Sequence, residues 1–350
     1  MIPRTLLALF ALGTASVRSG AQAQSGPIIG WGDNFHGQAS PPADTYIDFD
    51  AGFDMSVGVT ASGASRNWGE GYPFGGFGPP PPVRVRAAAG RQWWVELRDD
   101  GTVQALGNGP SQVPPDLFTD IDAAQMWAAG LRFDGTLVQW GSVPPGPPLG
   151  LPLPTGSFVE ISVGDGHAQA RRADGTVQGW GQNYAGQAVL PAGNYIEVSA
   201  GGSISIGLRD DGTLVATGVN SYGLITNVPQ GRFVAISAGS GVAAAIREDG
   251  TIVTWGNAST TWMAPPPGRF VRIACGANYC LAMRDMSCYA NCDGSTAGPV
   301  LTVNDFMCYL NRFAAADPKA NCDASTVPPV LNINDFVCFI STYAAGCSGP

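Results

Sequence analysis

The side chains best suited to holding a metal ion or forming cross-links lie in a duplicated segment near the C-terminus. Residues 291–313 align without a gap with residues 321–343. Each copy opens on Asn-Cys-Asp-x-Ser, which combines oxygen donors with a thiol, and reaches Asn-Asp-Phe at the head of an amphipathic run. The apolar residues of that run recur with the period of an α-helix. Each copy is therefore predicted to be a loop followed by a helix.

This duplication resembles the dockerin family, in which two loop-helix repeats bind calcium. The resemblance implies calcium as a cofactor, because hard cations take several oxygens from one loop and a carboxylate from the following helix. Each loop departs from the family by three extra residues and by a threonine where glycine is usual, and two carboxylates per loop predict weak binding. The alternative is a disulfide-held helix pair in which these residues cap helices. The implied ligands are Asn291, Asp293, Ser295, Thr302 and Asp305 in the first copy, and Asn321, Asp323, Ser325, Asn332 and Asp335 in the second.

The eight cysteines of the chain all follow residue 274. An even number of cysteines in an exported chain is typical of a disulfide framework rather than of a metal or redox site. Two pairs recur at the offset of the duplication, so each loop is predicted to be joined to its own helix. A closed loop of about 15 residues contributes roughly 3 kcal/mol of stability, which so small a module needs. The predicted pairs are Cys292 with Cys308, Cys322 with Cys338, Cys288 with Cys347, and Cys275 with Cys280.

The N-terminus predicts export. Arg4 precedes an apolar stretch over 6–17, and Ala-Gln-Ala at 21–23 provides a cleavage site, so residues 1–23 are expected to be a secretory signal peptide. That stretch is too short to span a bilayer, and no later segment is expected to span one. A net charge of −9 with a single lysine, Lys319, argues against nucleic acid or an anionic membrane as a partner. The expected location is extracellular or associated with the cell envelope.

The middle of the chain is a tandem repeat of three strand-like phrases. A phrase ending in Trp-Gly, or a variant of it, occurs seven times between residues 31 and 256. A second phrase, such as YIEVSAG at 195–201, alternates apolar and polar residues, and a third ends in Asp-Gly-Thr, a hairpin signal. Repeats of about 38 residues with short strands are typical of propeller blades. The predicted fold is all-β: a seven-bladed β-propeller over 24–286, followed by a small α-helical, disulfide-rich loop-helix pair over 287–350.

The ends of the repeat array favour a closed ring over a solenoid. IIGWG at 28–32 has no hairpin partner before it, and YCLAMRD at 279–285 has none after it. Pairing the first strand with the last would satisfy both edges, whereas a solenoid would need caps that the sequence does not show. The architecture therefore depends on residues 28–32 lying beside residues 279–285.

Residues 28–286 resemble the regulator of chromosome condensation repeat family. The resemblance is carried by WGDNFHGQ at 31–38, by WGQNYAGQ at 180–187 and by the Asp-Gly-Thr rhythm. The short repeats look more like the bacterial branch, which includes beta-lactamase inhibitory protein type II, than like the eukaryotic repeats, and this resemblance implies binding through a propeller face and no catalysis. The nucleotide-exchange activity of the nuclear members is not expected in an exported, acidic chain, because fold analogy alone does not transfer function.

The repeats can be aligned on the glycine that ends the second phrase. The position three residues after that glycine, which we call a column of the alignment, holds large side chains. A ring of such side chains at one height would form an aromatic-rich rim with the composition of a binding hot spot. The alternative is that they pack between blades. The candidate binding residues in this column are Trp93, Trp127, His167 and Tyr279.

The sequence gives little support for catalysis. With only two histidines, His36 and His167, it lacks the material for a Ser-His-Asp arrangement or a histidine-based zinc site, although a carboxylate pair stays open. We expect a secreted, non-enzymatic binding protein whose propeller recognises an extracellular protein or glycan. The C-terminal module is expected to dock it to a surface or scaffold. The alternative is a secreted inhibitor of an extracellular enzyme.

Overall fold

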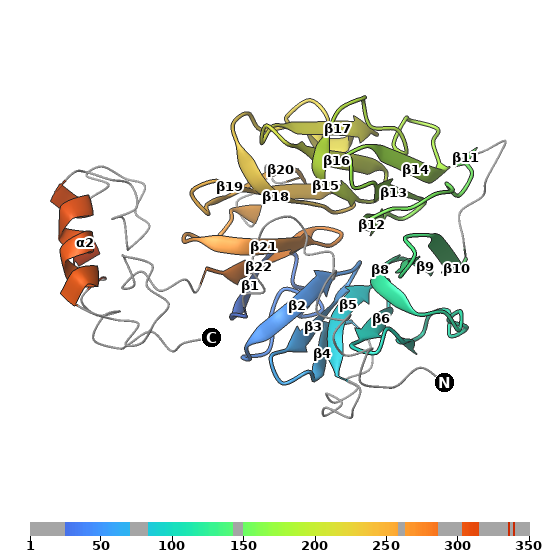
Figure 1. The fold of residues 1–350 in the computed structure, drawn as a ribbon, viewed down its shortest axis with the longest axis horizontal. Helices are drawn as coiled ribbons and strands as arrows, with labels where there is room; N and C mark the ends of the chain where they lie inside the picture. The colour runs from blue at the N-terminus through green and yellow to red at the C-terminus, as the bar shows by residue number, and fades with distance from the viewer. Residues whose placement is uncertain are drawn as a thin grey trace. The chain divides into compact units, whose positions relative to one another are not determined.

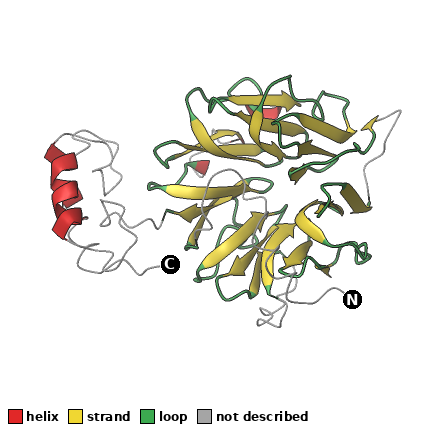
Figure 2. Cartoon of the chain, viewed as in Figure 1, coloured by secondary structure: helices red, strands yellow, loops and turns green. Residues whose placement is uncertain are grey.

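The computed structural model describes residues 25–70, 83–142, 150–257, 263–285 and 303–314, together with residues 335, 336 and 339. The chain divides into two compact units, Met1–Pro266 with Phe270–Arg284, and Pro267–Arg269 with Asp285–Pro350. The described part of the first unit consists mainly of strands and loops, as Figure 2 shows, with a short 3-10 turn, η1, at Ser221–Gly223.

Within its described residues, the first unit contains seven antiparallel sheets of three or four strands in a propeller-like arrangement (Figure 1). Six of these sheets are built from strands that are consecutive in the chain, and the seventh combines β21 and β22 with β1. In spatial order, the sheets are β1 (Ile28–Gly32), β22 (Tyr279–Arg284) and β21 (Phe270–Cys275); β2 (Tyr46–Ala51), β3 (Met55–Thr60) and β4 (Ser65–Gly69); β5 (Arg84–Ala89), β6 (Trp93–Arg98) and β7 (Val103–Gly107); β8 (Phe118–Ala124), β9 (Trp127–Arg132) and β10 (Leu137–Gly141); β12 (Glu160–Val163), β13 (His167–Arg171), β14 (Val177–Gln182) and β11 (Gly150–Leu151); β15 (Tyr195–Ala200), β16 (Ile204–Arg209) and β17 (Leu214–Gly218); and β18 (Phe233–Ala238), β19 (Val242–Arg247) and β20 (Ile252–Gly256).

The Asp-Gly-Thr phrase forms the hairpin that leads into the strand of the Trp-Gly phrase or its variant, as its residues predict. In one copy the Asp174 carboxylate accepts hydrogen bonds from the Thr176 backbone N–H at 2.9 Å and from its hydroxyl at 2.7 Å. Gly175 has a φ of +84°, which glycine adopts without strain. Equivalent bonds occur at Asp100, Asp134, Asp211 and Asp249. The threonine hydrogen bonds lower the pKa of Asp134, Asp174 and Asp211.

The first strand of the array pairs with the last, which confirms the predicted ring closure. β1 runs antiparallel to β22, with Ile28 opposite Met283 and Gly32 opposite Tyr279. Trp31 on β1 is buried, so the pair shares a core as well as backbone hydrogen bonds. Because β1 and β22 pair with each other, neither strand has an unpaired edge at this joint.

One strand of each sheet, which we call the inner strand, is held by side chains of the preceding sheet; the inner strands are β2, β5, β8, β12, β15, β18 and β21. Glu160 on β12 accepts a hydrogen bond from Val198 N on β15 at 3.2 Å. The step from the last sheet back to the first uses Arg272 on β21, whose guanidinium donates to the Asp48 carboxylate and to Ile47 O. In six sheets a register shift immediately precedes this position, and such bulges redirect side chains. Equivalent contacts join Asp48 to Ala87, Arg86 to Asp120, and Glu197 to Ile236. The position two residues further along the inner strand makes similar contacts, from Asp122 to Val163 and from Ser237 to Cys275.

The turns that follow the inner strands pack against one another at one end of the sheets. Asp165 N donates to Gly201 O at 3.1 Å, and Ser240 N to Gly276 O at 3.3 Å. A Cβ on Gly276 would lie 2.2 Å from Gly52 O, so this approach requires glycine. Residues from all seven inner strands line a cavity of about 70 Å³ here. We call this end, which also contains the ends of the Trp-Gly strands, the glycine end.

The second unit contains helix α2 (Val303–Ala314), which begins directly before Asn304 and Asp305, where the amphipathic pattern predicts a helix. In the second copy of the duplication, residues 335, 336 and 339 are also helical. Equivalent aromatic residues of the two copies pack together. The Tyr309 and Phe339 rings are stacked with centroids 3.9 Å apart, and those of Phe306 and Phe336 lie 6.4 Å apart. Helices in the described part of the chain are all too short or too polar to cross a membrane.

Candidate functional site

Three exposed aromatic side chains lie on equivalent loops at the glycine end. Phe35, Tyr184 and Tyr222 are 87%, 68% and 63% exposed. Their loops follow β1, β14 and β17, the strands that carry the Trp-Gly phrase or its variant. We call residues 33–39, 182–188 and 219–225 the aromatic loops. Exposed aromatic side chains that recur at one end of a fold are typical of a binding surface.

The aromatic loops share a framework of side-chain hydrogen bonds. In the first, Asn34 Oδ1 accepts from Ala39 N at 2.8 Å, and Gln38 Oε1 accepts from His36 N at 2.9 Å. Such bonds from side chains to the local backbone fix loop conformation. The same pair of bonds occurs in the second loop, from Ala188 to Asn183 and from Ala185 to Gln187, and the first of them occurs in the third loop, from Ile225 to Asn220. The exposed rings are therefore presented from ordered backbones.

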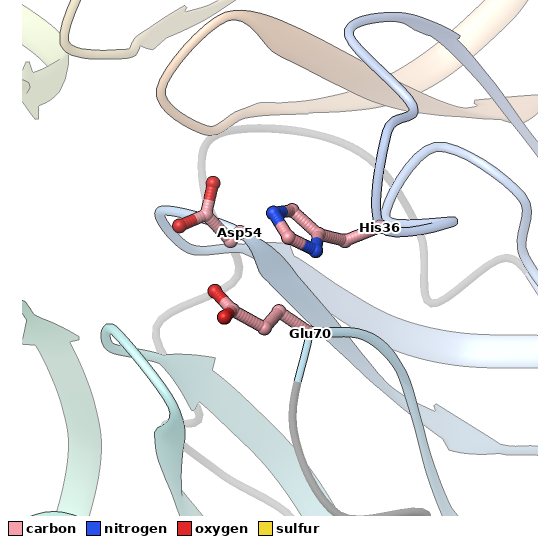
Figure 3. A group of neighbouring side chains, drawn as sticks. All are labelled: His36, Asp54 and Glu70. Carbon is pink, nitrogen blue, oxygen red and sulfur yellow. The ribbon is translucent and has the colours of Figure 1, made fainter.

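The first aromatic loop brings His36 beside two carboxyl groups of the neighbouring sheet (Figure 3). Asp54 lies in the turn between β2 and β3, and Glu70 directly follows β4. Glu70 N donates to Asp54 O at 2.8 Å, which holds these two residues together. One ligand atom from each of the three side chains lies within 4.8 Å of the other two. His36 is exposed, whereas the two acids are half-buried.

The surroundings of Asp54 favour its protonated form. Burial raises the pKa of Asp54, and the charge of Glu70 and a side-chain hydrogen bond with it raise the pKa further. His36 and Arg91 act in the opposite direction. A hydrogen bond between two carboxyl groups requires a proton between them, because two carboxylates are both acceptors. A bound cation, like a proton, would relieve the repulsion between these two neighbouring carboxyl groups.

The four residues predicted to form a binding rim are buried between sheets, each in a different sheet. Packing between sheets was the alternative interpretation of this column, and the contacts favour it. Each residue reaches the following sheet: Trp93 Nε1 donates to Gln125 O, Trp127 Nε1 to Gly164 O at 3.1 Å, and Tyr279 OH to Met55 O at 2.7 Å, and His167 Nε2 lies 2.9 Å from Ser205 Oγ. Direct contact of these side chains with a partner stays a prediction, and the structure gives them no exposed rim.

The predicted calcium ligands fall mostly outside the described residues. Asp305 lies within α2, and Asp335 is helical and buried. The remaining ligands of both loops, Asn291, Asp293, Ser295, Thr302, Asn321, Asp323, Ser325 and Asn332, lie outside the described part of the chain. Calcium binding therefore stays a prediction.

Cys275 and Cys280 form the predicted disulfide, which joins β21 to β22. Cys308 on α2 is also disulfide-bonded. Its predicted partner, Cys292, lies outside the described residues, as do Cys288, Cys322, Cys338 and Cys347. The pairing within the C-terminal module stays a prediction.

The family comparison matches two of the repeats. Residues 158–187 and 195–224 fit the model of the regulator of chromosome condensation (RCC1) repeat. These two segments contain β12–β17 and all but the last residue of the second and third aromatic loops. No curated protein matches the chain.

Solved structures show the same fold at low sequence identity. The yeast RCC1 protein Prp20, in a complex with Kap60, is similar to 87% of this chain over 96% of its own, at 14% identity and a TM-score of 0.62. Prp20p from Saccharomyces cerevisiae in a second structure, which concerns its binding to Gsp1p and histones, covers 75% of this chain and 92% of its own, at 16% identity and a TM-score of 0.60. Human WBSCR16 covers 74% of this chain and 100% of its own, at 15% identity and a TM-score of 0.58.

The chain thus has a propeller-like fold that it shares with the RCC1 proteins of known structure, and two of its repeats match the RCC1 repeat model. The chain also has three aromatic loops, the His36–Asp54–Glu70 cluster and a duplicated C-terminal segment.

Proposed function

We propose that this protein is a secreted, non-catalytic binding protein, in which a seven-bladed propeller recognises an extracellular protein or glycan through its glycine end. The observation that carries this proposal is the recurrence of Phe35, Tyr184 and Tyr222 as exposed rings on equivalent, ordered loops. Large aromatic side chains supply much contact area at low cost in conformational entropy, and they dominate binding hot spots. Protein partners are also named for the yeast relatives, which bind Kap60, Gsp1p and histones.

The C-terminal module has a separate role in this proposal. It docks the propeller to a surface or scaffold, as its resemblance to dockerins implies, with weak calcium binding by the duplicated loops. The packing of Tyr309 against Phe339 supports a compact pair of repeats in which the two copies stabilise each other. Calcium would add to this stability, since a ligand that binds only the folded state shifts the folding equilibrium.

Capture experiments with surface variants test the recognition role. The full chain would be immobilised and exposed to extracellular material from cultures of the source cells, and the captured protein or glycan identified and its affinity measured. The triple variant Phe35→Ser, Tyr184→Ser, Tyr222→Ser should bind the captured partner at least tenfold more weakly, because it removes three exposed contact rings. The matched control is Phe133→Ser with Leu117→Ser, which alters exposed apolar side chains near the Asp-Gly-Thr turns instead.

Equal loss of binding in the two sets of variants, or undiminished binding by the triple variant, would contradict recognition through the glycine end. If the captured partner is an enzyme, its activity should be measured with and without the full chain. Inhibition that the triple variant loses would assign the binding protein an inhibitory role.

A further inference from the structure

We propose that His36, Asp54 and Glu70 form a binding site for one divalent transition-metal ion, with Zn²⁺ as the reference ion. The three side chains come from the first aromatic loop, from the turn between β2 and β3 and from the end of β4. The three side chains converge, as Figure 3 shows. This site is separate from the duplicated loops of the C-terminal module, and it does not depend on the identity of any partner.

The donor set suits zinc and similar ions. Imidazole nitrogen favours zinc, copper, iron or nickel over calcium and magnesium, and carboxylate oxygen completes many zinc sites. Three protein ligands leave one position open, as in zinc sites that bind a water or an added ligand. The sequence has too few histidines for a site built mainly on imidazole, but one imidazole is enough when two carboxylates accompany it.

The spacing fits closure around an ion by side-chain rotation. Zinc ligands lie about 2.0–2.2 Å from the ion, so neighbouring ligand atoms are about 3–4 Å apart. The donor atoms here lie within 4.8 Å of one another. The backbones that carry them are fixed, because Gln38 accepts from His36 N and Asp54 O accepts from Glu70 N. Ordered backbones with adjustable side chains are the arrangement that a metal site needs.

The repeated fold does not by itself place metal-binding side chains together, as an equivalent place elsewhere in the fold shows. The second aromatic loop meets the next sheet in the same way, since Tyr184 OH lies 3.0 Å from Ser203 Oγ in the turn between β15 and β16. The residues equivalent to His36, Asp54 and Glu70 at that place are Ala185, Ser203 and Val219. The repeat therefore brings an aromatic loop close to the next sheet in both places. Of these two places, only the one at the first aromatic loop has three metal-binding side chains.

Zinc titration of the full chain tests the proposal. Isothermal titration calorimetry with ZnCl₂, in excess CaCl₂ so that oxygen-rich loops are occupied, should show one zinc site per chain in the wild type. His36→Ala and Asp54→Asn should each weaken the binding at least tenfold, because each removes a ligand. Glu248→Gln is the matched control: it removes an exposed carboxylate, paired with Arg232, on another sheet and should leave the affinity unchanged.

Two further measurements separate a metal site from a change in folding. Co²⁺ should give absorption bands of an N/O-coordinated ion that are lost in His36→Ala, while circular dichroism and the thermal unfolding temperature of that variant stay those of the wild type. Because the ligands must be deprotonated to bind a metal ion, zinc binding should release protons and weaken as the pH falls. Absence of zinc binding in the wild type, or equal affinity in wild type and His36→Ala, would overturn the proposal.

Discussion

His167 illustrates how the packing between sheets controls the charge of a single residue. Its ring is fully buried, and Nε2 lies 2.9 Å from Ser205 Oγ, which also accepts a hydrogen bond from Gln169 Nε2. Burial lowers the pKa of His167 from 6.5 to about 4. Because the pKa in the folded state lies below that in the unfolded state, the unfolded chain takes up the proton first as the pH falls. The stability present above pH 6.5 is therefore lost progressively toward pH 4.

Substitution of His167 by glutamine should remove this pH dependence. Between pH 7 and pH 4 the free energy of unfolding of the wild type should fall by up to about 3 kcal/mol more than that of His167→Gln, because glutamine does not titrate. Chemical denaturation of both proteins at several pH values measures the difference. Parallel pH profiles would show that His167 is already protonated in the folded protein or retains an ordinary pKa.

Residue types were easier to predict than residue directions. The column of Trp93, Trp127, His167 and Tyr279 is visible in the sequence, but the sequence does not show whether it faces a partner or the next sheet. Its polar atoms reach backbone or hydroxyl groups of that sheet. The His36–Asp54–Glu70 cluster was missed because its members come from two sheets and three phrases. The shared spacing of WGDNFHGQ and WGQNYAGQ was the available signal, since equivalent loops reach equivalent turns.

At the scale of elements, β1 has an importance beyond its five residues. It supplies the outer strand of the sheet that contains β21 and β22, although those strands follow it by more than two hundred residues in the chain. Its Trp31 packs in one core cluster with residues such as Val242 and Met263. β1 should therefore contribute as much to stability as a strand inside the array.

Alanine substitutions of equivalent tryptophans test this contribution. Trp31→Ala on β1 and Trp180→Ala on β14 should each lower the free energy of unfolding by about 3–5 kcal/mol, since both side chains are buried. Phe35→Ala, in the exposed loop directly after β1, should change it by less than about 0.5 kcal/mol. Chemical denaturation provides the values. A cost for Trp31→Ala as small as that of Phe35→Ala would mean that β1 is not part of the closed array in solution.

Most strands of the array could be predicted because their alternation and hairpin turns are local properties of the sequence. The pairing of β1 with β22 could also be predicted, from two strand-like segments that each lacked a partner. The two-residue strand β11 (Gly150–Leu151) carries too little sequence for a pattern. The register shifts before Asp48 and Arg272 were not predictable either, because a bulge depends on which partner strand it faces.

In the first unit as a whole, the same kinds of contact join each sheet to the next all the way around the array. Acid and hydroxyl side chains of one inner strand bind backbone N–H groups of the next, or an arginine takes their place, and Arg272 with Asp48 completes the series. Stability is therefore distributed over similar interfaces, as in other repeat proteins. The joint between β1 and β22 differs from these interfaces, because its two strands are brought together from the ends of the chain.

That joint determines how the molecule responds to tension. Since Ile28 lies opposite Met283, the chain runs into β1 and out of β22 at the same end of the pair. A force applied between residues 25 and 285 would load its hydrogen bonds one after another, as when a zip is opened, rather than all at once. The Cys275–Cys280 bond keeps β21 and β22 together meanwhile. Stretching in optical tweezers should release β1 first, at a lower force than the remaining sheets, and simultaneous rupture of the whole unit would contradict this order.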